Sequence, residues 1–332
     1  NGPQEVKVVL QNSGTTAISS VQLQWSLNGA VQTPVTYTGS LAAPGGSGLS
    51  MDTVTLGTVN IPGGDNDLKV WTELAGDVNN INDTLIETVA TAMSGNYTIN
   101  AATPTGGANF KSFNDFSDAL YQKGVCGPVE VDVLPGIYNE AVTFRDHPGA
   151  GPGNPVRING HGQRLFYATG TGSNDIRHLL TLSGTKYMRI DSMVLFTASD
   201  RGWGTWITGG AMYDSITNCR YDMTTITATA AANGTGIAFS SSTSSPTGSG
   251  VSGKHCYIAG NHMQGPVAAG GPYYGVSMGS GGNDSNIIVN NIFENILNTG
   301  VYLSSTAGTL VQGNEIHRST KQVASVLYGV SV

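Results

Sequence analysis

The sequence predicts an all-β protein made of an N-terminal β-sandwich followed by a parallel β-helix solenoid. Three observations carry this prediction. Only 11% of the 332 residues are charged and 46 are Gly, a composition that favours turns and strands over helices. Near the N-terminus, short alternating strands recur about every ten residues. Further along the chain, a pattern of two short apolar runs is repeated several times, which is typical of a repeat architecture.

Residues 1–92 form the predicted sandwich. In "SVQLQWSLNGAV", apolar Val21, Leu23 and Trp25 alternate with polar residues, which indicates a strand with one buried face. Asn28-Gly29 then predicts a hairpin turn. The stretches "VVLQNSGTTAISSVQLQWSLNG" and "DLKVWTELAGDVNNINDTL" resemble the CARDB family, the cell-adhesion-related domains of bacterial surface proteins. This resemblance implies an immunoglobulin-like sandwich.

Residues 93–332 form the predicted β-helix. Gly-apolar-x-apolar occurs at 236–239, 275–278, 300–303 and 329–332, and apolar-x-x-Asn-x-apolar occurs at 258–263, 288–293 and 311–316. A unit of this length buries its apolar side only by stacking on its neighbours. The repeated asparagines should then stack as an amide ladder; they are Asn261, Asn291 and Asn314.

A single helix is predicted at 112–122, with Ser112 as N-cap and Gly124 as the stop. Its expected role is to cover the first coil of the solenoid. Residues 96–332, with the opening "FNDFSDAL…VEVDVLPGIYNE", resemble the right-handed parallel β-helix proteins of the pectate-lyase-like superfamily, including pectin methylesterases. Because the repeat stops partway through a copy after Gly329, the chain is expected to be an excerpt of a longer protein, truncated at its C-terminus.

The resemblance carries the fold and not the activity, because the catalytic blocks of pectin methylesterases and polygalacturonases are missing. Two weaker candidates for acid–base chemistry remain. Strand alternation places Glu294 and His317 side by side on an exposed sheet, and "YDSITNCRYDM" brings Asp214, Arg220 and Asp222 within nine residues. For both, the preferred interpretation is solvated surface groups with incidental ion pairs.

Glycan binding is a further candidate activity. The Gly-rich stretch "SDRGWGTW" holds Trp203 and Trp206 beside Asp200 and Arg201, and exposed aromatic rings next to hydrogen-bonding groups can hold sugar rings. A weaker version is "GGPYYGV", with Tyr273 and Tyr274. For both pairs, packing in the core or in a loop is the preferred interpretation and glycan binding is the alternative.

Two other features concern modification and ions. Asp-Ser/Thr-aliphatic triplets resemble acceptor sites for O-linked glycans in some bacterial surface proteins, with Thr53 and Thr84 as the plausible sites and Ser192 assigned to a strand. No cofactor is predicted: the acidic segment with Asp77, Asn80 and Asp83 is interpreted as a solvated turn, with a Ca²⁺ site as the alternative.

The three cysteines are an odd number, which disfavours a disulfide framework. We expect Cys126, Cys219 and Cys256 all to be buried thiols, with a Cys219–Cys256 bridge as the alternative.

These observations limit the function. A net charge of −7 disfavours nucleic-acid binding, and no apolar run is long enough to span a membrane. The preferred interpretation is a non-enzymatic extracellular or bacterial cell-surface protein, an adhesin or structural stalk with glycan binding as an option. Its expected partners are other domains of a longer parent chain and glycans or host cell-surface polymers. The alternative is a polysaccharide lyase or hydrolase.

Overall fold

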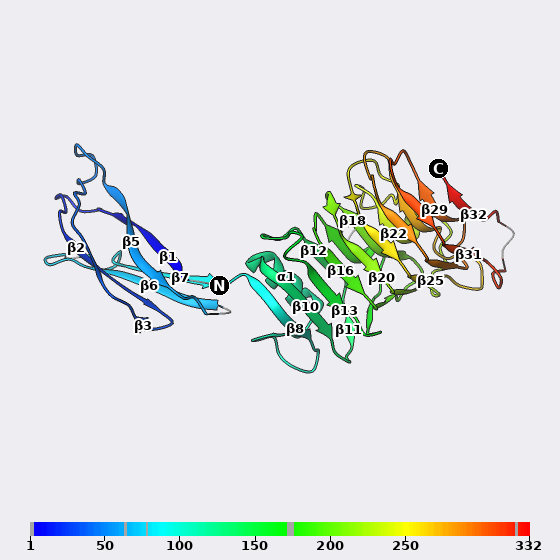
Figure 1. Cartoon of the computed structure of the whole chain (residues 1–332), viewed down its shortest axis with the longest axis horizontal. Coiled ribbons are helices and arrows are strands. Elements are labelled where there is room, and N and C mark those ends of the chain that lie inside the picture. Colours follow the sequence, from blue (N-terminus) through cyan, green and yellow to red (C-terminus); the bar gives the residue numbers. More distant parts are fainter. Residues whose placement is uncertain (1–2, 63–64, 78, 171–175, 323–324) are drawn as a thin grey trace. The chain divides into compact units, whose positions relative to one another are not determined.

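The structure is a computed structural model that describes residues 3–62, 65–77, 79–170, 176–322 and 325–332. The chain forms two compact units, Asn1–Thr91 and Ala92–Val332 (Figure 1). The described residues are mostly strand, with one α-helix and one turn of 3₁₀ helix, η1 (Ala231–Asn233).

The N-terminal unit is a sandwich of two antiparallel sheets. One sheet pairs β1 (Gln4–Gln11) with β5 (Met51–Val59). The other has the order β3 (Ala30–Val31), β2 (Val21–Leu27), β6 (Asp65–Glu73) and β7 (Thr84–Ala90), with β4 (Val35–Tyr37) also paired to β2.

A single core lies between these two sheets. The predicted alternation in β2 buries Val21, Leu23 and Trp25, and they pack with Val54 of β5 and Val70 of β6. The Asn28-Gly29 hairpin turn is present, with positive φ at both residues. Alternation of period two therefore gives this unit its buried and exposed faces.

The second unit is a parallel β-helix with three long sheets. The first sheet has the order β9 (Asn109–Phe110), β8 (Met93–Ile99), β10 (Val125–Val133), β13 (Val156–Asn159), β16 (Met188–Asp191), β20 (Ser215–Thr217), β24 (Tyr257–Ala259), β27 (Ile287–Val289) and β30 (Leu310–Gln312). The second has β11 (Tyr138–Asn139), β14 (Arg164–Tyr167), β17 (Val194–Thr197), β21 (Arg220–Asp222), β25 (His262–Gln264), β28 (Ile292–Glu294) and β31 (Glu315–His317). The third has β12 (Val142–Arg145), β15 (His178–Ser183), β18 (Gly202–Thr208), β22 (Gly234–Phe239), β26 (Tyr274–Met278), β29 (Thr299–Leu303) and β32 (Tyr328–Ser331).

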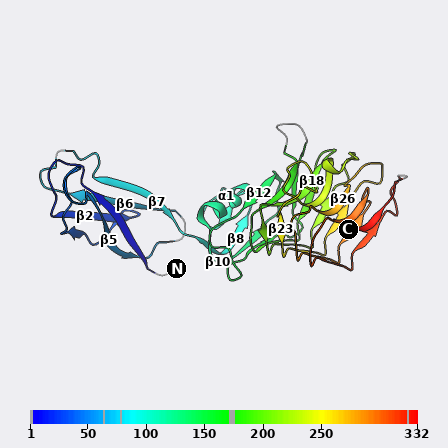
Figure 2. The same ribbon diagram turned by 90° about the horizontal axis from the view of Figure 1, so that it is seen from above.

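Each coil of the solenoid contributes one strand to each sheet in the order first, second, third, and the coils follow one another toward the C-terminus (Figure 2). A short fourth pairing joins β19 (Ala211–Met212) to β23 (Gly253–Lys254). Inside the first sheet, one aliphatic residue per coil stacks on the next, in the register Val131, Ile158, Ile190, Ile216, Ile258 and Ile288. All six are at most 2% exposed, and burying each such side chain contributes about 1.5–3 kcal/mol.

The repeated glycine has a packing reason. Gly236, Gly275 and Gly300 stand at or near the starts of third-sheet strands, where the chain turns in from the second sheet. A Cβ on Gly275 would lie 2.6 Å from the ring of Phe293, which belongs to the second sheet of the next coil. The same holds for Gly300 and Ile316, at 2.6 Å. The interior side chain of the following coil thus occupies the space that a Cβ would need.

The repeated asparagine lies at the corner between the first and second sheets. Nδ2 of Asn261 donates to Oδ1 of Asn291 at 2.9 Å, and Nδ2 of Asn291 donates to Oδ1 of Asn314 at 2.9 Å. Each acceptor oxygen also takes the backbone N–H of the preceding asparagine. The three amides form one continuous row along the solenoid.

Helix α1 (Phe113–Lys123) begins as expected. The Ser112 hydroxyl accepts the Asp115 N–H at 3.0 Å, and Gly124 ends the helix. Phe113, Phe116 and Leu120 are buried against the first coil and α1 contacts β8, β9 and β12. This helix covers apolar side chains that no preceding coil covers.

None of the three cysteines forms a disulfide, and the predicted burial is wrong for one of them. Cys219 and Cys256 are 1% exposed, and no bridge joins them. Cys126 is exposed because it lies on the outward side of β10, between Val125 in the core and Gly127.

Candidate functional site

The outer face of the second sheet carries two rows of mainly polar side chains. Strand register places Arg220, His262, Ile292 and Glu315 in one row and Asp222, Gln264, Glu294 and His317 in the other. Four of the predicted catalytic residues therefore share this face, namely Arg220, Asp222, Glu294 and His317. Their inward neighbours Met263 and Phe293 are 1% exposed.

Contacts join these side chains in pairs that differ from the predicted one. Nε2 of His262 lies 3.0 Å from Oε2 of Glu294, whereas His317 Nε2 lies 3.5 Å from Glu315 Oε1. Glu294 and His317 occupy adjacent positions in one row, yet each contacts another partner. The Glu–His pair of this face is thus Glu294 with His262, because the long glutamate side chain reaches across to the other row.

Asp222 and Arg220 belong to separate contacts on the same face. Asp222 Oδ1 accepts from the Thr224 hydroxyl at 2.7 Å, and its other oxygen lies 3.6 Å from Arg164. The Arg164 guanidinium also stacks over the ring of Phe196, 3.8 Å from the centroid. Arg220 donates to Gln264 at 3.0 Å. These groups are held by one another along the sheet.

Asp214 is not part of this surface, so the predicted Asp214–Arg220–Asp222 cluster is wrong. Asp214 precedes β20 of the first sheet and is 1% exposed. Its oxygens accept the Met188 N–H at 2.8 Å and the Thr185 hydroxyl at 2.5 Å. Burial raises the pKa of Asp214 to about 7. Nearness in sequence misled here because a corner between two sheets separates residue 214 from residues 220 and 222.

Of the two interpretations of the tryptophan pair, packing holds for Trp203, which is not exposed for sugar binding. Both tryptophans lie in β18, and Trp203 is 0% exposed with its Nε1 donating to Ala232 O at 3.0 Å. Trp206 is half-buried and donates to Ser240 O at 2.7 Å. The segment reads as a loop because of its glycines, but β15 and β22 pair with both its edges.

A serine-rich insertion covers this part of the third sheet. Residues 240–252 connect β22 to β23, and Thr243 O lies 3.1 Å from Nε2 of His178, whose ring contacts both indoles. Pro246 O accepts from the buried Ser277 hydroxyl at 2.8 Å. Asp200 and Arg201 pair with each other at 2.7 Å on the exposed loop before β18.

The coils beyond this insertion expose tyrosines on the third sheet. We call Tyr273, Tyr274, Tyr302 and Tyr328 the tyrosine cluster. The rings of Tyr273 and Tyr274 lie 4.9 Å apart in an edge-on arrangement, and Tyr274 and Tyr302 lie 5.1 Å apart. Tyr328 lies in the same row as Tyr274, two coils on, and is 50% exposed. Burial raises the pKa of Tyr274 above its ordinary value.

Two members of this cluster, Tyr302 and Tyr328, were not predicted from the sequence. The signal was present, because Tyr274 and Tyr328 both directly precede the repeated glycine, in "YGVSM" and "YGVSV". Only strand register shows that Tyr302 lies in the adjacent row.

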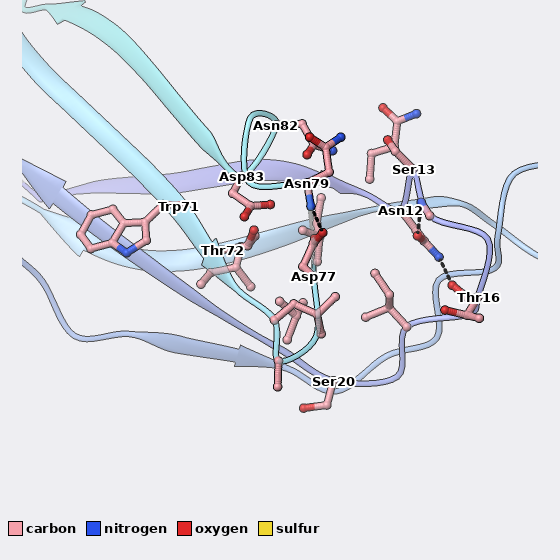
Figure 3. Close-up of a pocket in the computed structure, with 18 of the residues that line it drawn as sticks. Asn12, Ser13, Thr16, Ser20, Trp71, Thr72, Asp77, Asn79, Asn82 and Asp83 are labelled. Carbon is pink, nitrogen blue, oxygen red and sulfur yellow. Dashed lines mark hydrogen bonds between the residues drawn. The ribbon is translucent and has the colours of Figure 1, made fainter.

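The remaining candidates lie in the N-terminal unit. Thr53 in β5 and Thr84 in β7 are exposed, while Ser192 lies in a turn with positive φ and not in a strand. Asp77 and Asp83 line one cavity with Asn79 and Asn82, and Asn80 is absent from that lining (Figure 3). Among the described residues, no three His, Cys, Asp or Glu side chains gather closely enough to hold a metal ion. No described helix has the length and apolar character of a membrane span.

Comparison with known proteins gives fold similarities only. No family model and no curated protein matches the chain, so the CARDB resemblance stays a prediction. Among solved structures, pectate lyase Pel9A is similar at 10% identity over 71% of this chain and 80% of that chain, with a TM-score of 0.35. The catalytic domain of a GH87 alpha-1,3-glucanase in complex with nigerose is similar at 12% identity over 93% of this chain and 68% of that chain, with a TM-score of 0.32. The residue roles proposed below rest on this chain's own geometry.

Proposed function

We propose that this chain is a non-enzymatic, secreted or cell-surface protein of bacterial type, an adhesin or structural stalk whose β-helix binds glycans at the tyrosine cluster. The observation that carries the proposal is the grouping of four tyrosines on one outer face. Aromatic rings offer an apolar surface to a sugar ring, and their hydroxyls offer hydrogen bonds.

The position of the cluster supports an extended ligand. Tyr274 and Tyr328 are separated by two coils, roughly 9.6 Å at the usual strand spacing, and Tyr302 lies in the neighbouring row between them. A chain of sugars that runs along the solenoid axis would meet one ring after another. A stiff repeat surface is well suited to such binding.

The test is binding to immobilised glycans. We expect Tyr274→Ala and Tyr302→Ala each to weaken binding about tenfold, the equivalent of about 1.4 kcal/mol. Tyr257→Ala is the matched control, because Tyr257 is 41% exposed on the first sheet, away from the cluster. Equal binding by all four proteins, or no binding by the wild type, would contradict the proposal.

A polysaccharide lyase or hydrolase is the second candidate, and the second-sheet face favours it. Asp222 and Glu294 share one row two coils apart, which places their backbones roughly 9.6 Å from each other. Inverting glycosidases separate their two carboxyl groups by about 6.5–9.5 Å, and His262 contacts Glu294 as a second proton-transfer group.

Turnover assays separate the two candidates. The purified chain would be incubated with pectate, alginate, chondroitin and neutral glucans, with Ca²⁺ present, and assayed for unsaturated products and new reducing ends. The binding proposal predicts no products. Turnover that Glu294→Gln and Asp222→Asn both abolish would establish the enzymatic candidate, with Glu315→Gln as the control on the same face.

A further inference from the structure

The sandwich of the N-terminal unit is open along one side. A cavity of about 810 Å³ penetrates between its sheets. Leu10, Val21, Leu23 and Val70 line it, and all four belong to the apolar core of this unit. Figure 3 shows Trp71, Asp77 and Asp83 around the same cavity. Core side chains therefore form part of the wall of this cavity.

The opening exists because the two sheets differ in width. Four strands stand side by side in one sheet, in the order β3, β2, β6, β7, whereas the described residues give the other sheet only β1 and β5. The cavity is lined by the end of β1, the segment 12–20, the start of β2, the end of β6, the segment that leads into β7 and the start of β7, and no residue of β5 reaches it. The uncovered strand is thus β7, and the strand nearest to it across the opening is β1.

Side chains on the inner face of β7 are exposed, as expected if no strand of the other sheet packs over them. Leu85 is the register partner of Val70 and Glu87 is the partner of Leu68, so both point to the core side of their sheet. Val70 is 5% exposed, but Leu85 is 46% exposed and Glu87 is exposed too. An apolar and an acidic side chain therefore face the space that a further strand would fill.

The edge of β1 offers backbone groups to such a strand. The Asn12 N–H donates to Ser50 O at 2.8 Å, and the register has no irregularity between residues 7 and 11. Hydrogen-bonded pairs alternate along an antiparallel ladder, so the N–H and C=O of Val9 point away from β5. Val9 is 66% exposed.

The charge of the N-terminal unit indicates what kind of segment could bind in the opening. Residues 1–91 contain two lysines, no arginine and eight acidic residues, a net charge of −6. Asp77 and Asp83 line the cavity, and Glu87 faces the opening. A second copy of this chain would bring an equally acidic surface, whereas a basic side chain would meet Glu87 favourably.

We propose that the opening between β1 and β7 is a strand-acceptor site that binds an extended segment of a partner protein. The segment adds to the free edge of β1 and closes the sheet over the inner face of β7. Its inward residues are apolar except for one lysine or arginine opposite Glu87. Strand addition of this kind uses main-chain hydrogen bonds for affinity and alternate side chains for specificity.

The test uses the whole chain and a synthetic peptide. The peptide has nine residues, capped at both ends, with valine alternating with threonine and the central valine replaced by lysine. Two matched peptides carry glutamate or proline at that centre. Calorimetry measures binding, and hydrogen exchange follows the segment 4–11. We expect the lysine peptide to bind and to protect this segment, and the other two to bind at least about tenfold more weakly.

Three variants test where the peptide binds. Val9→Pro removes the outward N–H of β1 and should weaken binding at least about tenfold. Thr53→Pro is the matched control, because Thr53 pairs with Val9 in the register and points to the opposite edge; it should leave binding nearly unchanged. Glu87→Lys, an exposed change that leaves the strands intact, should reverse the preference from the lysine to the glutamate peptide.

Several results would overturn the proposal. They are failure of the wild type to bind the lysine peptide at about 1 mM, equal effects of Val9→Pro and Thr53→Pro, or an unchanged preference in Glu87→Lys. Sedimentation of the chain alone measures its oligomeric state and could give one further contradicting result. A dimer that Val9→Pro abolishes would make a second copy the occupant and would refute the partner assignment.

Discussion

Nδ2 of Asn291 donates a hydrogen bond of 2.9 Å to Oδ1 of Asn314, one coil further along the solenoid. The same Asn291 accepts from both the backbone and the side chain of Asn261 and donates to Ile258 O. Every polar group of this buried amide therefore has a partner, and each partner belongs to a neighbouring coil. The amide row joins consecutive coils at a corner where the strands themselves are interrupted.

Removal of the middle amide should be costly. Asn291→Ala removes four hydrogen bonds to buried or partly buried groups, and we expect the free energy of unfolding to fall by about 3 kcal/mol. Asn314→Ala is the control, because Asn314 is half-buried at the end of the row and its loss should cost less. Urea unfolding of the two variants measures this. Equal losses would show that the amides act singly and not as a row.

The glycine column makes a second prediction. Gly275→Ala places a Cβ 2.4 Å from Gly300 O and 2.6 Å from Phe293, so the coil must move, and overpacking of this kind costs about 1–3 kcal/mol. Gly329→Ala is the matched control, because the nearest atom to its Cβ would be 3.9 Å away. Thermal unfolding should separate the two variants, and a tolerated Gly275→Ala would refute the packing argument.

Asp214 makes the stability depend on pH. Its pKa is raised by burial to about 7, so the folded chain favours the protonated carboxyl. The stabilising contribution is therefore complete below pH 3.8, the ordinary pKa, and is lost as the pH rises through about 7. Asn286 accepts the Cys256 N–H from the corresponding place two coils on, which suggests Asp214→Asn as a neutral replacement.

The measurement is the difference in unfolding free energy between Asp214→Asn and the wild type. This difference should grow in favour of the variant by about 2 kcal/mol from pH 5 to pH 7. Asp222→Asn, at a half-buried surface position, is the control and should show no such trend. A difference that is constant with pH would exclude Asp214 as the titrating group.

His178 should act in the opposite direction. Burial between Trp203 and Trp206 lowers the pKa of His178 to about 4, so the folded chain favours the neutral imidazole. Its contribution is present above pH 6.5 and is lost as the pH falls through about 4. We expect His178→Phe to reduce the loss of stability on acidification, measured by tryptophan emission during urea unfolding. The control is His255→Phe, at an exposed position where the ring stacks on Tyr213; it should leave that loss unchanged.

Repeats made much of the architecture predictable from sequence. The asparagine and glycine motifs recur because each coil contacts the next through the same few residues. One sequence motif therefore predicts the local structure, the stacking of the coils and the strand register. The helix was equally predictable from the sequence, because Ser112, the apolar stripe and Gly124 are local signals that lie close together along the chain. Alternation in β2 gave its buried face directly.

The candidate sites were legible only in part. Sequence alone determined that coils stack and that residues one repeat apart become neighbours. Only the tertiary structure decided that Trp203 is covered, that Glu294 meets His262, that Asp214 lies inside and that Tyr302 joins Tyr274. The physical reason is that these outcomes depend on loops of unequal length and on side chains that reach between rows. Periodicity in the sequence predicts on which face of a strand a side chain lies. It does not predict which other segment of the chain covers that face.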